Sequence, residues 1–240
     1  MQYRVIGNVM PAVEMLLEQG ESVYTQSGGM AWMNDKMEMQ TNTHGGLLKG
    51  LGRMLAGESV FMSTYTATVS GGEIGFSATV PGEVMPVDVG TYRGLICQKG
   101  AFLCAQTTVS QDIVFKKKLG AGLFGGEGFI LQQLGGSGMA FLEIDGNKIE
   151  KNLAPGEVLR VDTGNVVAFE GTVGYEIEMV RGGMNVFFGG EGLFLTRLVG
   201  PGRVILQTQN FAEFCARIRP YMPTASSSSS IGSIGNNSNN

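Results

Sequence analysis

A short phrase centred on Gly-Glu occurs three times in this chain of 240 residues. The copies are Leu55–Met62 (LAGESVFM), Phe124–Leu131 (FGGEGFIL) and Phe188–Leu195 (FGGEGLFL). Their glutamates lie 69 and 64 residues apart. Self-similarity at a nearly constant spacing is typical of tandem structural units, each of which needs its neighbours to bury an apolar face. The repeat therefore limits the fold more than any other feature of the sequence.

A second set of Gly-Glu phrases alternates with the first along the chain. These phrases begin the stretches Gly20–Trp32, Gly82–Leu95 and Gly156–Phe169, and each has a glycine seven residues after its glutamate. Because the two sets alternate, the chain is predicted to consist of three units with two halves each. The units cover about 1–80, 81–154 and 155–219, and together they form a single domain over 1–223.

The apolar residues follow the spacing of β-strands rather than helices. Tyr175, Ile177 and Met179 alternate with two glutamates, as in a strand with one buried face. The continuous apolar runs at Phe129–Leu131 and Val204–Leu206 are typical of strands covered on both faces. These patterns predict that each unit is built from short strands.

The turn residues agree with this prediction. Glycine accounts for 38 of the 240 residues, about twice its usual share, as expected for many tight turns between strands. The dipeptide Asp145-Gly146 predicts a hairpin, because type I′ turns need positive φ at both central positions. A β-trefoil usually has shorter units and a propeller has at least four blades. We therefore expect an all-β fold of three sandwich or double-stranded β-helix units around a pseudo-threefold axis.

The C-terminal part of the chain differs from the rest. The segment Asn210–Arg219 predicts one short helix, with Asn210 as its cap and Pro220 after its end. Beyond it, residues 224–240 are rich in Ser, Asn and Gly and carry too little apolar area to offset the entropy of ordering. This tail is predicted to be disordered.

One glycine motif is typical of nucleotide-binding proteins. Gly120, Gly122 and Gly125 have the G-x-G-x-x-G spacing, which binds a dinucleotide when a helix begins at the last glycine. The residues that follow are strand-like, so the free N–H groups of a helix N-terminus are not expected here. We interpret the motif as part of a repeated turn and predict no nucleotide cofactor.

The sequence is also poor in catalytic and metal-binding residue types. Its single histidine, His44, has no nucleophile motif around it, and its three cysteines have no known metal-ligand spacing. A cupin-like enzyme would need clustered histidines and carboxylates. The prediction is a protein that is not an enzyme and has no cofactor or metal. Methionines around Trp32 (Met30, Met33, Met37 and Met39) are interpreted as packing residues at an interface.

The repeated turns themselves are candidate functional positions. The pairs that recur are Gly57 and Glu58, Gly126 and Glu127, and Gly190 and Glu191. We expect a structural role, in which each carboxylate accepts a backbone N–H and fixes the start of a strand. The alternative is that symmetric carboxylates bind a cation.

Basic residues near these turns form a second candidate. The candidate polyanion contacts are Arg53, Lys116, Lys117, Lys118 and Arg181, with Arg197 close by. With a net charge of −4 the chain has no overall basic field, and aromatic residues that could stack on bases are few. A solvated face or salt bridges between subunits is the expected role, and binding of RNA or another polyanion along this rim is the alternative.

Two long stretches resemble a known family. GGLLKGLGRMLAGESVFMSTYTA and KKKLGAGLFGGEGFILQQLGGSGMAF are similar to hallmark stretches of the bacterial branch of the altered-inheritance-of-mitochondria (AIM) family, long catalogued as a domain of unknown function. The similarity covers roughly Met1–Ile218. It implies three tandem units like those of the tryptophan-RNA-binding attenuation protein (TRAP-like) and a homotrimeric ring. The family supplies no catalytic residues, and fold similarity to an RNA binder does not carry function.

The expected function follows from these observations. The N-terminus lacks the pattern of a signal peptide and no window holds eighteen apolar residues, so a cytoplasmic protein without a transmembrane segment is predicted. We expect a non-enzymatic, ring-forming β protein that acts as a scaffold or binding platform, with RNA or polyanion binding as the alternative.

Overall fold

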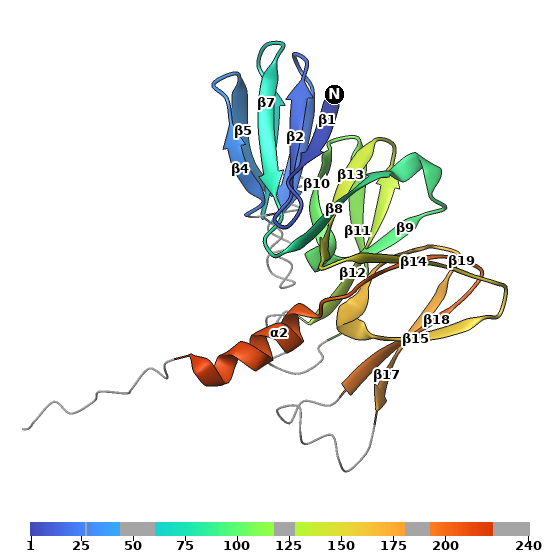
Figure 1. Cartoon of the computed structure of the whole chain (residues 1–240). Helices are drawn as coiled ribbons and strands as arrows, with labels where there is room; N and C mark the ends of the chain where they lie inside the picture. Colours follow the sequence, from blue (N-terminus) through green and yellow to red (C-terminus); the bar gives the residue numbers. More distant parts are fainter. Residues whose placement is uncertain (27, 44–60, 118–127, 181–192, 223–240) are drawn as a thin grey trace, which may run out of the picture.

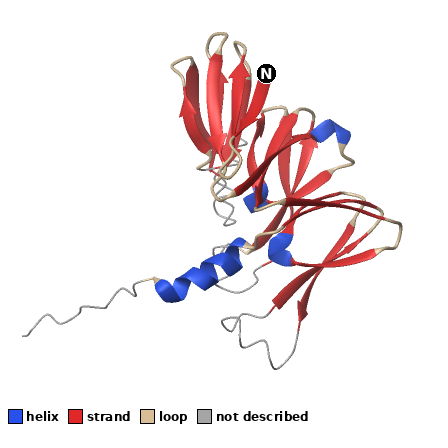
Figure 2. Ribbon diagram, viewed as in Figure 1, coloured by secondary structure: helices blue, strands red, loops and turns tan. Residues whose placement is uncertain are grey.

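The computed structural model describes residues 1–26, 28–43, 61–117, 128–180 and 193–222. Within these ranges the chain is mostly β-strand, and the α-helix is the short α2 near the C-terminus, Phe211–Ile218 (Figure 2). The prediction of an all-β fold with a short C-terminal helix is confirmed at this level. The predicted disordered tail lies outside the described residues.

The strands form four antiparallel sheets that follow one another through the molecule, with strands of successive sheets interleaved in the sequence (Figure 1). The first has the order β1-β2-β7-β4, with β1 at Gln2–Ile6, β2 at Ala12–Leu17, β7 at Gly72–Ser77 and β4 at Met30–Met33. The second has the order β5-β6-β3-β10-β13-β8, with β5 at Met37–Thr43, β6 at Phe61–Ala67, β3 at Ser22–Gln26, β10 at Phe102–Gln106, β13 at Met139–Asp145 and β8 at Gly82–Asp88.

The remaining strands form the third and fourth sheets. The third has the order β11-β12-β9-β16-β19-β14, with β11 at Val109–Lys117, β12 at Phe129–Gly136, β9 at Leu95–Gln98, β16 at Val166–Glu170, β19 at Gly202–Gln207 and β14 at Lys148–Leu153. The fourth has the order β15-β18-β17, with β15 at Val158–Asp162, β18 at Leu193–Val199 and β17 at Gly174–Val180. Four 3-10 turns complete the described structure: η1 at Val89–Thr91, η2 at Lys99–Ala101, η4 at Thr163–Asn165 and η6 at Arg219–Tyr221.

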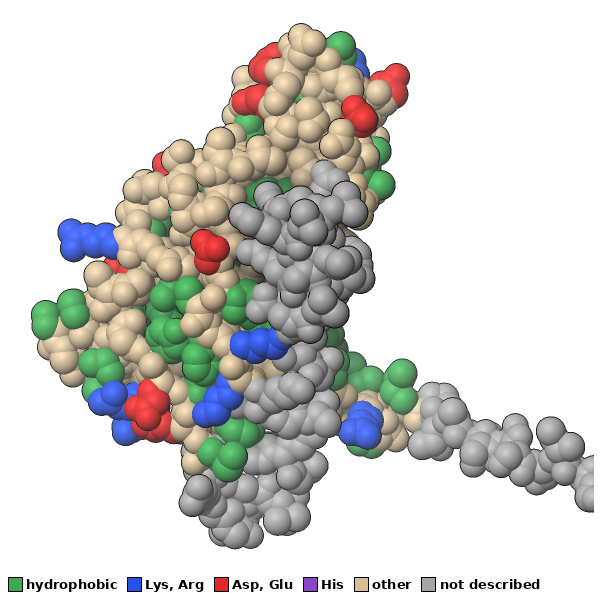
Figure 3. Space-filling model, turned by 180° about the vertical axis from the view of Figure 1, so that it is seen from behind, with side chains coloured by type: hydrophobic (Ala, Val, Ile, Leu, Met, Phe, Trp, Pro, Cys, Tyr) green, Lys and Arg blue, Asp and Glu red, His purple; other side chains and the backbone are tan. Residues whose placement is uncertain are grey.

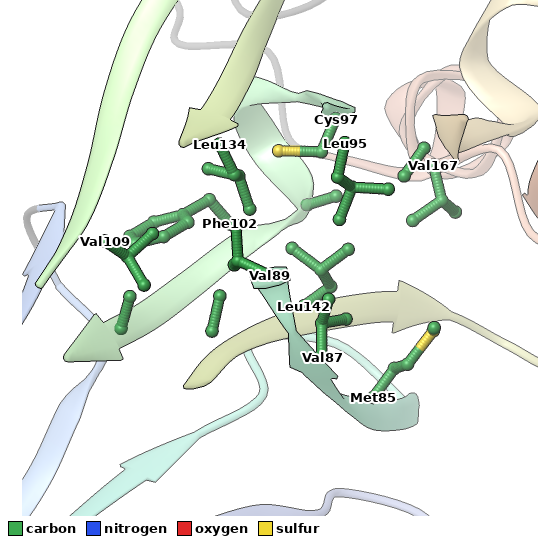
Figure 4. Close-up of a cluster of buried hydrophobic side chains, with 14 of the residues drawn as sticks. Met85, Val87, Val89, Leu95, Cys97, Phe102, Val109, Leu134, Leu142 and Val167 are labelled. Carbon is green, nitrogen blue, oxygen red and sulfur yellow. The ribbon is translucent and has the colours of Figure 1, made fainter. Parts of the chain in front are cut away.

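Each pair of successive sheets encloses a hydrophobic core. The first core includes Met15, Phe76 and Phe141 and lies between the first and second sheets. The second core lies between the second and third sheets, where side chains from β8, β9, β10, β12 and β13 point toward one another (Figure 4). The third core, with Phe169 and Leu198, lies between the third and fourth sheets. The architecture is thus a stack of sheets with apolar layers between them.

The predicted strand types are observed. In β12 and β19, which have a neighbouring strand on each side, Phe129–Leu131 and Val204–Leu206 are buried. In the edge strand β17, Ile177 is buried as predicted, whereas Met179, which the alternation placed on the same buried face, is 57% exposed. The second and third sheets are covered on both faces, which requires continuous apolar runs in their central strands.

The predicted hairpin at Asp145-Gly146 is wrong. Gly146 does have a positive φ of 74°, but β13 pairs with β8 and β10 whereas β14 pairs with β19. Both edges of β13 are already occupied, so β14 has no free edge to join. The turn instead carries the chain from the second sheet to the third.

The second set of Gly-Glu phrases does not occupy one kind of place. Gly20 and Gly156 have positive φ and stand in turns before β3 and β15. There Glu21 accepts a hydrogen bond from the backbone N–H of Glu18 (2.9 Å), and Glu157 accepts one from Ala154 (2.8 Å). Glu83 lies inside β8 and accepts from the N–H of Lys148 in the following sheet (2.9 Å). The expected alignment of Glu83 with the other two glutamates is therefore wrong.

The helix α2 begins at the predicted cap. Asn210 Oδ1 accepts hydrogen bonds from the backbone N–H groups of Ala212 (3.1 Å) and Glu213 (3.3 Å), which satisfies donors that an uncapped helix would leave free. The predicted apolar face is not covered by the described residues, since Phe211 and Phe214 are 45% and 47% exposed. In Figure 1 the helix projects away from the sheets.

Candidate functional site at the open sheet edges

Most of the predicted site residues lie outside the described part of the chain. These are the turn residues Gly57, Glu58, Gly126, Glu127, Gly190 and Glu191, and the basic residues Arg53, Lys118 and Arg181. The apolar ends of the three repeated phrases are described. They form the starts of β6, β12 and β18, each the second strand of an antiparallel pair, β5 with β6, β11 with β12 and β17 with β18.

Lys116 and Lys117 are the two candidate polyanion contacts that the structure describes. Both are exposed on β11, the outer strand of the third sheet. Lys117 Nζ donates a hydrogen bond to the carbonyl of Ile177 in β17 (3.2 Å), so this ammonium connects the third and fourth sheets. Lys116 lies on the same strand and faces solvent.

The other basic residues of this region do not add to a continuous rim. Arg160 Nε and Arg197 Nε lie 3.2 Å and 4.0 Å from the carboxylate of Glu178. On the face shown in Figure 3, the Lys and Arg side chains of the described residues are spread among hydrophobic, acidic and other side chains. Some of the basic side chains in this region therefore make contacts within the fold instead of lying free along a rim.

Two edge-to-edge junctions join strands from successive segments of the chain. At the first, β3 pairs with β10 and Tyr24 lies opposite Ala105. At the second, β9 pairs with β16 and Ile96 lies opposite Phe169. All four side chains are buried, so each junction continues one sheet across two segments while its side chains enter the cores.

Two strands, β4 and β15, hold the same positions as the strands at these junctions but have no described strand paired to the corresponding edge. Among the described strands, β4 is hydrogen-bonded only to β7, and β15 only to β18. β4 reads Met-Ala-Trp-Met, and its Met33 is 38% exposed. In β15, the side chains of Val158 and Arg160 are exposed. Open strand edges present unpaired N–H and C=O groups that another strand can bind.

Trp32 packs its indole ring against the neighbouring strand at the β4 edge. Its ring lies on Gly75 of the neighbouring strand β7, so closely that a Cβ at Gly75 would stand 2.2 Å from the ring. A glycine is therefore required beneath the indole. Met37, at the start of the next strand, is buried, whereas Met39 is 49% exposed.

A cluster of polar groups connects β13 with the start of α2, with Gln207 as the link: it accepts from the N–H of Asp145 and donates to the carbonyl of Gly164, both at 3.0 Å. Asp162 accepts from the N–H of Gly164 and from Asn210 Nδ2, both at 2.9 Å. Burial raises the pKa of Asp162, and these two hydrogen bonds oppose the increase. Burial, together with the nearby negative charge of Glu143, raises the pKa of Asp145 to about 6. The cluster is a structural junction with one carboxyl that titrates close to neutral pH.

The cysteines behave as packing residues where they are buried. Burial raises the pKa of the Cys97 thiol to about 12 and also raises that of Cys104, so both stay protonated at neutral pH and are poor nucleophiles. Cys215 on α2 is exposed. In the described ranges no group of three or more His, Cys, Asp or Glu side chains is placed to hold a metal ion. No described helix is long and apolar enough to cross a membrane.

The interpretation of the methionines around Trp32 as packing residues at an interface stays a prediction, and the open edges were missed. The Met-Ala-Trp-Met segment was the available signal, because an apolar strand with no charged residue is unusual at a sheet edge. Nothing in the sequence of β15 marks it as an edge.

A family model, a sequence relative and a solved structure each match most of this chain. The family model described as Mitochondrial biogenesis AIM24 matches residues 3–209. An uncharacterised protein of Streptococcus pyogenes serotype M6 is 30% identical over 224 residues, which cover 90% of this chain and 88% of that protein. The crystal structure of another Streptococcus pyogenes protein has a TM-score of 0.75 at 24% identity, with 92% of this chain and 99% of that chain covered. The last similarity concerns the fold alone.

Proposed function

This chain belongs to the Mitochondrial biogenesis AIM24 family, and from that premise we propose that it is a non-enzymatic scaffold or binding platform. In this proposal three tandem TRAP-like β units make up each chain, and three copies assemble into a ring in the cytoplasm. The proposal assigns no catalytic residue and no cofactor.

The strand pairing supports the three units. Within residues 12–77 the first, sixth and third strands pair in one sheet (β2-β7-β4), and the fourth, fifth and second in the other (β5-β6-β3). The same order recurs in 82–145 as β8-β13-β10 and β11-β12-β9, and in 148–207 as β14-β19-β16 and β17-β18-β15. Each set encloses its own core. These ranges favour a boundary between the second and third units near 146–147 rather than 154–155.

A recurrent irregularity supports the same division. The third strand of each set has a register shift, between Met30 and Trp32, between Phe102 and Cys104, and between Val166 and Ala168. These shifts lie 72 and 64 residues apart. Bulges bend a strand and are retained as features of a fold, so their recurrence at one position argues for units of common design.

The proposed assembly rests on one observation, the two open strand edges of β4 in the first unit and β15 in the last unit. The sheets at the two internal junctions are completed by the next unit, whereas β4 and β15 have only one described neighbour each. A ring of copies would pair these two edges with each other, whereas the outer strands of each sheet, such as β5 and β8, would stay at sheet edges.

The native mass of the purified full chain tests this proposal. Native mass spectrometry and light scattering should give three times the 25.5 kDa chain mass. A stable monomer over the accessible concentration range would contradict the scaffold. The same sample, analysed for co-purifying protein and nucleic acid, identifies what the platform binds.

A second candidate function is polyanion binding, favoured by the exposure of Lys116 on the outer strand β11. Mobility shifts with RNA at low salt should then weaken in Lys116→Ala and disappear as salt is raised, because such binding releases counterions. Lys36→Ala, at an exposed lysine in the turn before β5, is the matched control. The absence of any shift at low salt would end this candidate.

A further inference from the structure

We propose that copies of this chain join head to tail, with β15 of one copy pairing antiparallel with β4 of the next. The register is the one used at both internal junctions, so that Arg160 lies opposite Met33 and Val161 lies opposite Trp32. The inference rests on the proposed assembly and names the strands and residues through which it occurs.

The two internal junctions are of one type. Each joins the second strand of one unit to the third strand of the next unit, β3 to β10 and β9 to β16. The strands that remain are the second strand of the last unit, β15, and the third strand of the first unit, β4. They are therefore the two halves of a third junction.

Neighbouring strands define which residue of β15 is equivalent to Tyr24 and Ile96. Tyr24 lies opposite Thr64, and Ile96 lies opposite Gln133. Each of these partners stands six residues after the glutamate of its repeated phrase. The residue six after Glu191 is Arg197, which lies opposite Arg160. Arg160 is thus the equivalent position.

The bulge defines the equivalent residue of β4. Ala105 and Phe169, the partners at the two junctions, each stand three residues after the first residue of the register shift, Phe102 and Val166. In β4 the shift begins at Met30, so Met33 is equivalent. Arg160 opposite Met33 is the third member of a series that begins with Tyr24 opposite Ala105 and Ile96 opposite Phe169.

Burial agrees with a missing partner at β4. Ala105 and Phe169 are fully buried, whereas the equivalent Met33 is 38% exposed. Pairing with β15 would cover this strand in the way that β3 and β9 cover β10 and β16. The resulting sheet would have the order β17-β18-β15-β4-β7-β2-β1, which is the six-strand order of the second and third sheets with β1 added.

The partner has to be a second copy. β4 belongs to the first sheet and β15 to the fourth, and Figure 1 shows these sheets at opposite ends of the molecule. A pairing of two different edges is heterologous, and such contacts either close into a ring or extend as a filament.

A cysteine pair tests the register. Met33→Cys and Arg160→Cys are introduced together into the full chain in a Cys215→Ser background, because Cys215 is exposed and Cys97 and Cys104 are buried. Directly opposite residues of antiparallel strands have Cα atoms within disulfide range, whereas diagonal residues are too far apart. Met33→Cys with Val158→Cys, two residues along β15, is the matched control.

Mild oxidation should convert most of the Met33→Cys/Arg160→Cys protein into covalent multimers on a non-reducing gel, with several-fold less from the control. A mixture of the two single-cysteine chains should give dimers only, and neither chain alone should cross-link. Equal cross-linking of the control would overturn the register. A multimeric native mass without cross-linking would overturn the β15–β4 interface and leave the proposed scaffold standing, whereas a monomer would overturn both.

Hydrogen exchange on the unmodified protein provides a second test that needs no variant. Amides of β4 and β15 should exchange more slowly in the assembly than after its dissociation by dilution. Amides of β10 should exchange slowly in both states. Equal exchange of β4 and β15 before and after dissociation would contradict the pairing.

Discussion

Glu143 offers a perturbation whose magnitude can be worked from the structure. This buried carboxylate in β13 accepts three hydrogen bonds through Oε1, from the N–H of Thr79 (2.5 Å), the hydroxyl of Thr79 (2.8 Å) and the N–H of Val80 (3.1 Å). The donors lie in the connection between β7 and β8, which leads from the first sheet to the second. Glu143 thereby anchors this connection to the second sheet.

Replacing Glu143 with Ala removes all three bonds. A net hydrogen bond contributes about 1 kcal/mol, with more for bonds to charged groups. Because Thr79 is exposed, water can satisfy its released donors in part, so we expect a loss of about 3 kcal/mol in the free energy of unfolding. Glu143→Gln keeps an acceptor oxygen and should lose about 1 kcal/mol.

The assay is urea unfolding of each variant at one protein concentration, since assembly makes apparent stability depend on concentration. Glu150→Ala, which removes an exposed carboxylate paired with Lys148, is the control and should stay within about 0.5 kcal/mol of the wild type. A Glu143→Ala variant as stable as this control would refute the role given to the three hydrogen bonds.

Three further predictions concern other parts of the fold. The pKa of Asp145 rises from 3.8 to about 6 on folding, so the native state binds a proton more tightly than the unfolded state and stability falls as pH rises through this window. Asp145→Asn should remove this part of the pH dependence of urea midpoints measured from pH 4 to pH 7. An unchanged pH dependence in the variant would contradict the prediction. Asn210→Ala should fray α2 by about 1 kcal/mol, seen as faster amide exchange at Phe214, whose N–H donates to the carbonyl of residue 210, whereas Asn210→Ser should retain the cap. Gly75→Ala should displace the single tryptophan, change its fluorescence and cost about 1–3 kcal/mol, while Gly100→Ala, where a Cβ meets nothing within 4 Å, should do neither.

Local signals in the sequence predicted local structure well. The alternation predicted a strand at Tyr175–Met179, although Met179, expected on its buried face, is exposed, and Asn210 predicted the start of α2, because each signal depends on residues only a few positions apart. The Asp145-Gly146 turn shows the limit of such signals. Its φ follows from the dipeptide, but the partner of β14 depends on which distant strand edges are still free, and β13 has none.

The candidate site was less accessible from the sequence for the same reason. Spacing placed Lys117 in a basic rim, whereas in the fold its ammonium donates to the carbonyl of Ile177. The open edges of β4 and β15 become visible only when all strand pairs are known. The repeated glutamates Glu58, Glu127 and Glu191 lie outside the described residues, so their structural role stays a prediction.

Native mass spectrometry of the wild type beside two Met33 variants tests the proposed head-to-tail assembly most directly. Like charges directly opposite on paired strands repel, and opposite charges attract. The wild type and Met33→Glu, whose carboxylate would face Arg160, should both give a multiple of the 25.5 kDa chain mass, whereas Met33→Arg should shift the population toward the single chain. Equal multimers from Met33→Arg and Met33→Glu, or a wild type that is monomeric, would contradict assembly through β15 and β4.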